Sequence, residues 1–233
     1  MHSTVVAPEQ WQEAHERLLA KEKAAMRAAD ELAAERRRMP MQRVEREYVF
    51  DAGDRQVSLL DLFDGRPQLA VYHFMFEPGD EEGCGGCSMF VDQLTHLAHL
   101  NARDVSFALV SRAPIARLHA YRDWMGWDVP WVSCGDSTFN PDMGVRGGFG
   151  FNVFLRDGND VYRTYFLQHG AMVQWIGSLW SLWSLTPYGG QSDDEDLPDG
   201  WPRAQQSFWY RRHDEFDDPP PSARRRVDPD DGS

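Results

Sequence analysis

The chain of 233 residues is long enough to form one domain with a sizeable core and short for two full ones. Its formal net charge of −13 argues against a nucleic acid or an anionic membrane as the main partner, because both repel an acidic surface. No apolar run approaches the roughly 20 residues of a membrane span, and the polar N-terminus lacks the apolar segment of a secretory signal. We therefore expect a cytoplasmic protein whose thiols are kept reduced.

Residues 1–40 are expected to be a helical extension at the N-terminus. Pro8 suits a helix start, Pro40 follows the helix end, and apolar residues recur at helical spacing between them among many charged ones. A helix over residues 8–38 with one apolar stripe implies that the stripe packs against the domain or against a second subunit.

Residues 41–216 are expected to form one domain, because strand and helix patterns alternate along them. The continuous apolar run of residues 69–76 is typical of a central strand that is buried on both faces. The other expected elements are two strands around a turn at 52–54, a helix over 87–101, a strand over 105–110, a helix over 114–124, a strand over 129–133, a hairpin of 152–155 and 161–167, and a helix over 171–185. This order predicts an α/β fold with a mixed sheet and helices on both of its faces.

The last residues, 217–233, are expected to be a disordered tail. They are rich in Pro and in charged residues and nearly free of apolar ones, so they cannot bury enough surface to offset the entropy lost on ordering. We interpret the three arginines at 224–226 as part of this solvated tail rather than as a contact patch.

The segment GCGGCS places Cys84 and Cys87 three residues apart, where the expected central strand gives way to a helix. The first turn of a helix offers free N–H groups and the positive end of the helix dipole, and both stabilise a thiolate. One thiolate of such a pair can attack a disulfide and its neighbour can then resolve the mixed disulfide. Four acidic residues between positions 77 and 82 oppose ionisation, and no nearby Lys or Arg in the sequence balances them. The residues alone leave the pKa of Cys84 open.

Metal binding and a purely structural role are the alternative interpretations of this pair. A zinc site would need two more ligands, which Cys134 and a histidine could supply, but the sequence contains no second C-x-x-C and no H-x3-H. Asp92, His96 and His99 would share one face of the expected helix, where a solvated polar surface explains them as well as a metal does. We expect neither a metal nor another cofactor.

Three further residues have a chemistry that the sequence leaves open. Cys134 follows an expected strand and is interpreted as a small buried residue rather than as a third redox thiol. His73 lies inside the apolar run of the central strand and is interpreted as a core histidine. His213 belongs to an aromatic and charged stretch that we expect to pack back on the domain, where it could reach the cysteine pair.

Several segments of the chain resemble the DUF899 group of thioredoxin-like proteins, which are predicted dithiol–disulfide oxidoreductases. The matching segments are VYHFMF (71–76), GCGGCS (83–88), ARDVSFALVSRAPIARLHAYRDWMGWDVPWVS (102–133), FNPDMGV (139–145), FLRDG (154–158), LTPYGG (185–190) and RRHDE (211–215). The resemblance covers roughly residues 8–216. It implies a thioredoxin-like fold of three α/β/α layers with an added N-terminal helix, and it implies that Cys84 and Cys87 occupy the active position.

The chain departs from two better-known groups of relatives. Thioredoxins carry a proline just before the strand that faces the cysteine pair, whereas residues 147–153 here contain none. Peroxiredoxins carry Pro-x-x-x-Thr-x-x-Cys, and aligning Cys87 with that cysteine puts Cys84 at the Thr position and Asp80 at the Pro position. The peroxidase motif is therefore absent.

These observations predict a thiol–disulfide oxidoreductase in which Cys84 attacks as a thiolate and Cys87 resolves. Its substrate would be a protein or small-molecule thiol or disulfide. The alternatives are a peroxiredoxin-like thiol peroxidase that uses the same pair, and a non-enzymatic binding or assembly protein of thioredoxin fold. The long N-terminal helix and the nine tryptophans are also compatible with a homo-oligomer.

Overall fold

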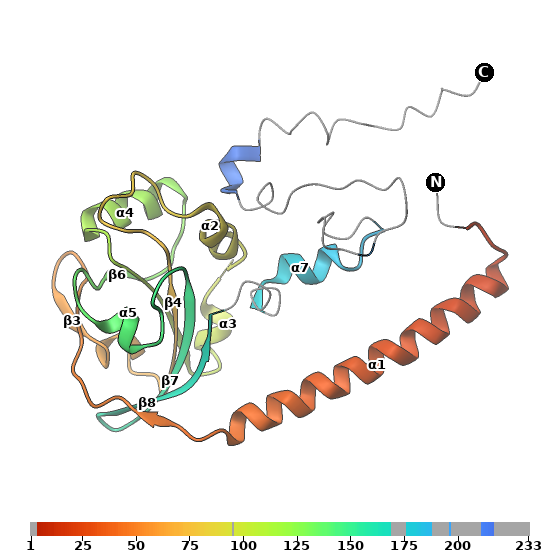
Figure 1. The fold of residues 1–233 in the computed structure, drawn as a ribbon, viewed down its shortest axis with the longest axis horizontal. Helices are drawn as coiled ribbons and strands as arrows, with labels where there is room; N and C mark the ends of the chain where they lie inside the picture. Colours follow the sequence, from red (N-terminus) through yellow and green to blue (C-terminus); the bar gives the residue numbers. More distant parts are fainter. Residues whose placement is uncertain (1–3, 95, 169–175, 188–195, 197–210, 217–233) are drawn as a thin grey trace.

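The fold is organised around an eight-stranded mixed sheet in the order β1-β8-β7-β4-β5-β6-β2-β3 (Figure 1). The computed structural model describes residues 4–94, 96–168, 176–187, 196 and 211–216. Within them the strands are β1 (Gln42–Arg43), β2 (Val49–Asp51), β3 (Gln56–Ser58), β4 (Gln68–His73), β5 (Val105–Ser111), β6 (Trp131–Ser133), β7 (Gly150–Asp157) and β8 (Asp160–Leu167). The helices are α1 (Pro8–Arg38), α2 (Gly85–Asp92), α3 (Ala98–Asn101), α4 (Ile115–Trp124), α5 (Phe139–Asp142) and α7 (Ser178–Trp183), with 3-10 turns η1 (Asp61–Phe63) and η3 (His213–Phe216).

Strand β4 lies in the middle of the sheet, as its apolar sequence predicts. It pairs in parallel with β5, where Tyr72 lies opposite Leu109, and antiparallel with β7, where Tyr72 lies opposite Phe151. Successive side chains of a strand point to opposite faces, so a strand covered on both faces needs apolar residues at nearly every position. The side chains from Leu69 to Phe74 are accordingly all buried.

Helical elements cover both faces of the sheet. On one face, Phe90 of α2 and Leu118 of α4 join a buried cluster with Tyr72. On the other face, Phe63 of η1 and Phe139 of α5 belong to a second buried cluster. A β-α-β-α-β unit that is followed by an antiparallel hairpin, with helices on both faces, is the α/β thioredoxin-like arrangement that the resemblance to the DUF899 group implies.

The structure corrects the expected helix over residues 87–101, which is broken into α2 and α3. Helix α2 ends at Asp92, and α3 begins only at Ala98. Between them the ring of His96 accepts a hydrogen bond from the Ala98 N–H at 3.1 Å, a local side-chain bond that competes with a continuing helix. Because of this break, Asp92, His96 and His99 do not share one helix face.

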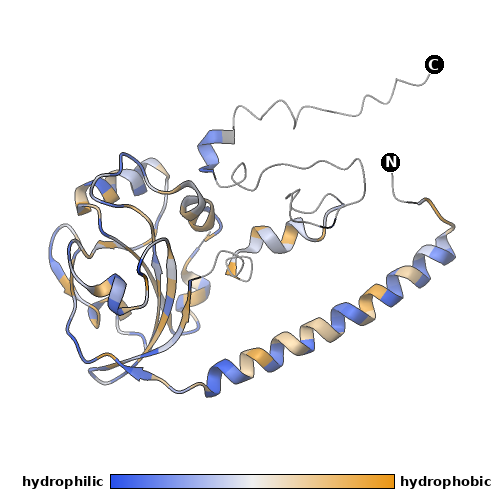
Figure 2. Cartoon of the chain, viewed as in Figure 1, coloured by the Kyte–Doolittle hydropathy of each residue, from blue (hydrophilic) through white to orange (hydrophobic). Residues whose placement is uncertain are grey.

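Helix α1 has the expected bounds, but the described part of the domain does not cover its apolar stripe. None of its residues is buried, and Trp11, Leu18 and Met26 are 58%, 54% and 67% exposed. Figure 1 shows α1 extending away from the sheet, and Figure 2 shows apolar and polar residues alternating along it. Of the two expected partners of the stripe, the described part of the domain does not cover it, and a second subunit stays a prediction.

Other expectations fall wholly or partly on residues outside the described ranges. The first part of the helix expected over 171–185 lies outside them, while α7 lies inside the expected range. The tail of residues 217–233 also lies outside them. None of the described helices is both long enough and apolar enough to cross a membrane.

Candidate functional site

The cysteine pair lies at the start of α2, after the loop that follows β4. Cys84 is the N-cap residue of α2, with φ −58° and ψ 126°, and its N–H donates to the carbonyl of Met75 at 3.1 Å. A Cβ at Gly83 would lie 2.8 Å from a ring carbon of Phe74, so glycine lets the loop pass this close to the core. The hydrogen bond to Met75 and the close approach at Gly83 hold Cys84 near the end of the central strand, as the sequence predicts.

The two thiols of the pair differ in accessibility. Cys84 is partly exposed, whereas Cys87 in the first turn of α2 is only 1% exposed. The N–H of Cys87 donates to the sulfur of Cys84 at 3.5 Å. All three cysteines of the chain are free thiols. Cys84 is therefore the more exposed thiol of the pair, and the body of the domain shields Cys87.

The two sulfurs also differ in acidity, in opposite directions. A hydrogen bond from the Cys87 thiol is the main reason that the pKa of Cys84 falls to about 6, and the N–H groups of Cys87 and Gly86 add to it. Burial and the charge of Asp80 act against this fall and are outweighed. Burial, followed by the interactions with Cys84, raises the pKa of Cys87 well above its ordinary value. In the structure the hydrogen bonds to the Cys84 sulfur outweigh burial and the nearby acid, a balance that the sequence left open.

Arginines from distant parts of the chain balance the acidic loop before Cys84. Nη1 of Arg112 lies 2.8 Å from a carboxylate oxygen of Glu77, and Arg212 forms an ion pair with Glu82. Arg117 donates to two carbonyl groups of the same loop, at 3.0 and 2.5 Å. Sequence reasoning missed these residues because they lie 35 to 130 positions from their partners. Only the fold brings them to the loop.

Buried hydroxyl groups hold the loop and the first turn of α2 in place. The hydroxyl of Ser88 donates to the carbonyl of Cys84 at 3.0 Å and lies 2.9 Å from the hydroxyl of Tyr121. Tyr121 in turn donates to the carbonyl of Gly83 at 3.4 Å. From β4, the hydroxyl of Tyr72 hydrogen-bonds the Cys87 thiol, and burial raises the pKa of Tyr72 well above its ordinary value.

The segment around His213 packs back on the domain, but it reaches α2 rather than the sulfurs. Nδ1 of His213 lies 2.8 Å from Oδ1 of Asp92, which also accepts a hydrogen bond from the Trp127 indole at 2.8 Å. The guanidinium of Arg212 lies 4.8 Å from the ring centroid of Trp124. The segment therefore contacts both the loop before Cys84 and the end of α2.

Cys134 and His73 lie on the other face of the sheet, in or next to the second buried cluster. Burial raises the pKa of Cys134 to about 11 and lowers that of His73 to about 4. The ring nitrogens of His73 lie 2.9 Å from Oδ1 of Asn140 and 2.9 Å from Nδ2 of Asn152, which suits a neutral imidazole. Both residues have the core positions that the sequence predicts.

No metal site is formed by the described residues. They contain no group of three or more His, Cys, Asp or Glu side chains that could hold an ion. Cys134 and Cys87 belong to buried clusters on opposite faces of the sheet, so Cys134 is not placed to complete a site with the pair.

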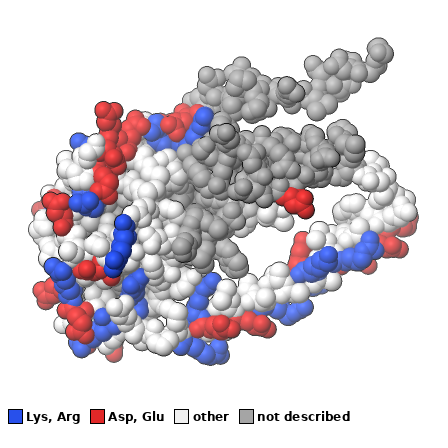
Figure 3. All heavy atoms as spheres, viewed as in Figure 1, with Lys and Arg blue, Asp and Glu red and all other residues white. Residues whose placement is uncertain are grey.

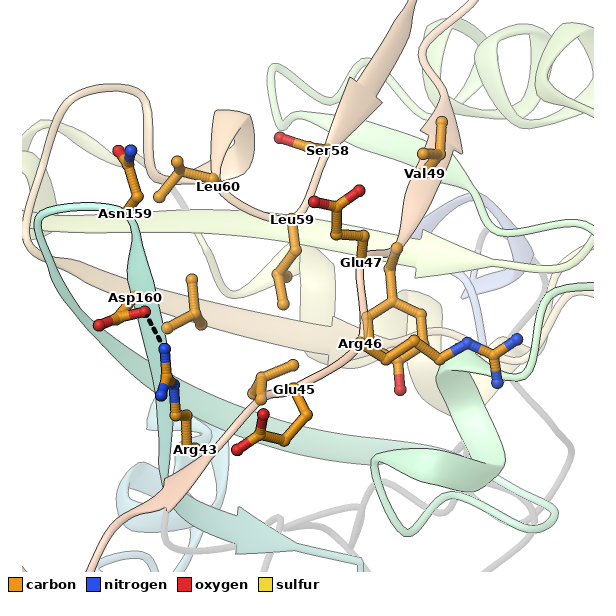
Figure 4. Close-up of a pocket in the computed structure, with 13 residues that line it drawn as sticks. Arg43, Glu45, Arg46, Glu47, Val49, Ser58, Leu59, Leu60, Asn159 and Asp160 are labelled. Atoms are coloured by element: carbon orange, nitrogen blue, oxygen red, sulfur yellow. Dashed lines mark hydrogen bonds and ion pairs between the residues drawn. The ribbon is translucent and has the colours of Figure 1, made fainter.

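A surface hollow of about 480 Å³ lies at the other end of the sheet (Figure 4). It is lined by the segment from β1 to the start of β2, by residues 58–60 at the end of β3, and by the start of β8. The 2.6 Å ion pair between Arg43 and Asp160 lies along one side. Strand β7 runs antiparallel to β4, so Asp160, just after the turn that follows β7, lies near the start of β4. The cysteine pair follows the other end of β4. The hollow contains no cysteine, so we do not connect it with the thiol chemistry.

The fold and the site define a class: a thioredoxin-like α/β domain with an accessible, acidic thiol beside a buried one at a helix start. The family model described as "Bacterial protein of unknown function (DUF899)" matches residues 1–216, so this chain belongs to the DUF899 family. None of the curated proteins compared matches the chain.

Several solved structures are similar over about half of the chain. A hypothetical protein from Sinorhizobium meliloti is 16% identical with a TM-score of 0.43, covering 56% of this chain and 71% of that one. A secreted Mycobacterium tuberculosis disulfide oxidoreductase homologous to DsbE of E. coli is 13% identical with a TM-score of 0.38, covering 52% and 83%. Peroxidoxin BcpB from M. tuberculosis is 16% identical with a TM-score of 0.40, covering 54% and 86%. Likenesses at this level carry no conclusion about activity.

Proposed function

We propose that this protein is a thiol–disulfide oxidoreductase in which Cys84 is the nucleophile and Cys87 the resolving thiol. The observation that carries the proposal is the asymmetry of the pair. Cys84 is accessible, caps a helix and has a pKa of about 6, so it is mostly thiolate at neutral pH. Cys87 is buried and hydrogen-bonded to it, which suits a thiol that acts only after the first has reacted.

The reaction has two exchange steps. The Cys84 thiolate attacks one sulfur of a substrate disulfide, a bond forms between them, and the other substrate sulfur leaves as a thiolate. Cys87 then loses its proton to the departing thiolate or to water and attacks the Cys84 sulfur. The Cys84–Cys87 disulfide forms and the second substrate sulfur leaves. The substrate gains two electrons and the pair loses two, which an external dithiol reductant restores.

The proposal extends to the substrate class and to the limits of the catalytic unit. The substrate would be a protein or small-molecule disulfide, and the chemistry needs no cofactor beyond the two thiols and the dithiol reductant. Residues 41–216 would form the catalytic domain, with residues 1–40 as a helical extension and 217–233 as a tail. We place this activity in the cytoplasm, where reductants keep dithiols reduced.

The test is a redox titration of the full chain. The protein is equilibrated in dithiothreitol buffers of graded potential, alkylated, and analysed by mass after digestion. We expect two thiols to be lost together, with Cys84 linked to Cys87. Cys134→Ser is the matched control, because that thiol is buried with a pKa near 11, and its removal should leave the transition unchanged.

Turnover assays separate the roles of the two cysteines and the alternatives. With a disulfide substrate and dithiothreitol, Cys84→Ser should abolish turnover. Without dithiothreitol, Cys87→Ser should trap a mixed disulfide between Cys84 and the substrate. Full activity of Cys84→Ser would refute the assignment. Peroxide consumption well above that of a free thiol would favour a peroxidase. Zinc that must be removed before the thiols react, or failure of the bond to form at any potential, would favour a binding protein.

A further inference from the structure

Helix α1 carries a mostly apolar stripe that the described part of the domain leaves uncovered, except at Arg36 near its C-terminal end. The stripe positions follow one another at alternating spacings of four and three residues: Trp11, His15, Leu18, Glu22, Ala25, Ala29, Leu32 and Arg36. Such a 4-3 pattern keeps one seam of a helix facing a second helix along its whole length. Leu19 and Met26 flank the seam and widen it. The pattern therefore suits a helix partner rather than the flat surface of a sheet.

The charges of α1 favour a partner helix that runs in the opposite direction. Its first turns carry Glu9, Glu13 and Glu16 with no Lys or Arg before position 17, and its last turn consists of the three arginines 36–38. Figure 3 shows both signs of charge along its surface. In a parallel pair these like charges would lie together, whereas an antiparallel pair places the acidic end of each copy beside the basic end of the other.

The seam is also symmetric under this reversal. In one antiparallel register, the numbers of two residues that face each other add up to about 47. Every seam residue then faces another seam residue. Leu18 then faces the partner's Ala29, a large side chain opposite a small one. Glu22 then faces the partner's Ala25 near the middle. Glu22, His15 and Arg36 are the polar positions of the seam, and polar seam positions restrict the register at a cost in stability.

The helix is long enough for a stable interface. At 1.5 Å per residue its 31 residues span about 46 Å, and a face about 12 Å wide gives about 550 Å² per copy. Two such faces bury about 1,100 Å², which exceeds the roughly 1,000 Å² expected of a specific interface.

From the seam, the charge polarity and the length, we propose that α1 is a dimerisation helix that pairs antiparallel with α1 of a second copy of this chain. The interface lies outside the thioredoxin-like domain, so it does not depend on the proposed thiol chemistry. The described domain meets α1 at its C-terminal end, where the Arg36 guanidinium lies 5.2 Å from the ring centroid of Tyr165. Antiparallel pairing would thus put the two domains at opposite ends of the helix pair.

Sedimentation velocity of the full chain tests the pairing. We expect a mass of twice 26.8 kDa at micromolar concentration. Leu18→Glu should weaken the dimer by about a hundredfold or more, because a symmetric interface loses the side chain twice. Ala20→Glu adds the same charge on the opposite face of α1 and should leave the dimer intact. Circular dichroism checks that both variants keep the helix. A monomeric wild type, or equal effects of the two variants, would overturn the proposal.

Cysteine cross-linking tests the direction of the pair. In a Cys84→Ser background, Leu18→Cys and Ala29→Cys chains are mixed and oxidised. The antiparallel register predicts a disulfide between one Leu18→Cys chain and one Ala29→Cys chain, and little linkage of Leu18→Cys chains to one another. Preferential linkage of identical chains would refute the antiparallel arrangement.

Discussion

The lowered pKa of Cys84 can be tested by removing its main cause. That cause is the hydrogen bond from the Cys87 thiol, so Cys87→Ala should raise the pKa while keeping the N–H donors of the first turn. A hydrogen bond to a charged group contributes about 1.5–3 kcal/mol, which corresponds to about one to two pH units. We therefore expect the midpoint of Cys84 ionisation to move from about 6 to between about 7 and 8.

The size of the effect on reactivity follows from the same values. At pH 7 a thiol with a pKa of about 6 is about nine-tenths ionised, and one with the ordinary value of 9.0 is about one-hundredth ionised. The more acidic thiolate is intrinsically a weaker nucleophile, by about twentyfold for this difference in pKa. The net gain in exchange rate at pH 7 is only about fourfold. The midpoint of the pH profile is therefore a better measure than the rate at a single pH.

The assay is the rate of Cys84 alkylation by iodoacetamide between pH 4 and 10, followed by mass after digestion. Cys134→Ser serves as the control and should reproduce the wild-type profile. A wild-type midpoint near 9, or a Cys87→Ala profile identical to the wild type, would refute the account of Cys84. A thiolate that is stabilised in the reduced protein also predicts a redox potential above about −270 mV, the thioredoxin value.

Three further predictions concern groups around the site and in the core. The pKa of His73 is lowered from 6.5 to about 4, so its neutral form stabilises the fold above pH 6.5. This contribution of about 3 kcal/mol to the free energy of unfolding is lost as the pH falls from 6.5 to 4. Urea unfolding of His73→Gln should lack that part of the pH dependence. Tyr121→Phe removes the hydroxyl 2.9 Å from Ser88 and should lower the free energy of unfolding by about 1–2 kcal/mol, whereas an unchanged value would show that the bond is dispensable. Arg212→Gln leaves Glu82 unpaired and should lower the free energy of unfolding by about 0.5–1 kcal/mol, because Glu82 is half exposed. This loss should shrink at high salt, and a loss that does not depend on salt would point to packing instead.

Local patterns predicted most of the elements that surround the site. The apolar run of residues 69–76 predicted the buried central strand, since only a strand covered on both faces needs apolar residues at successive positions. The spacing of Cys84 and Cys87 after that strand predicted their place at a helix start, because the strand ends in a Pro-Gly turn and an apolar helical pattern follows. The helix expected over 87–101 was wrong at its middle, where side-chain bonds to the backbone replaced helical ones.

Composition and local pattern therefore determined by themselves the α/β class, the central strand, the long helix α1 and the site of the two cysteines. Each of these features depends only on the periodicity and the residue types of its own short segment. Only the tertiary structure decided the burial of the two thiols and the charge balance of the loop before Cys84. The arginines that pair with Glu77 and Glu82, and the hydroxyl of Tyr121, come from positions 33 to 130 residues away. Interactions of this kind arise when the folded sheet brings distant segments together, and no local pattern encodes them.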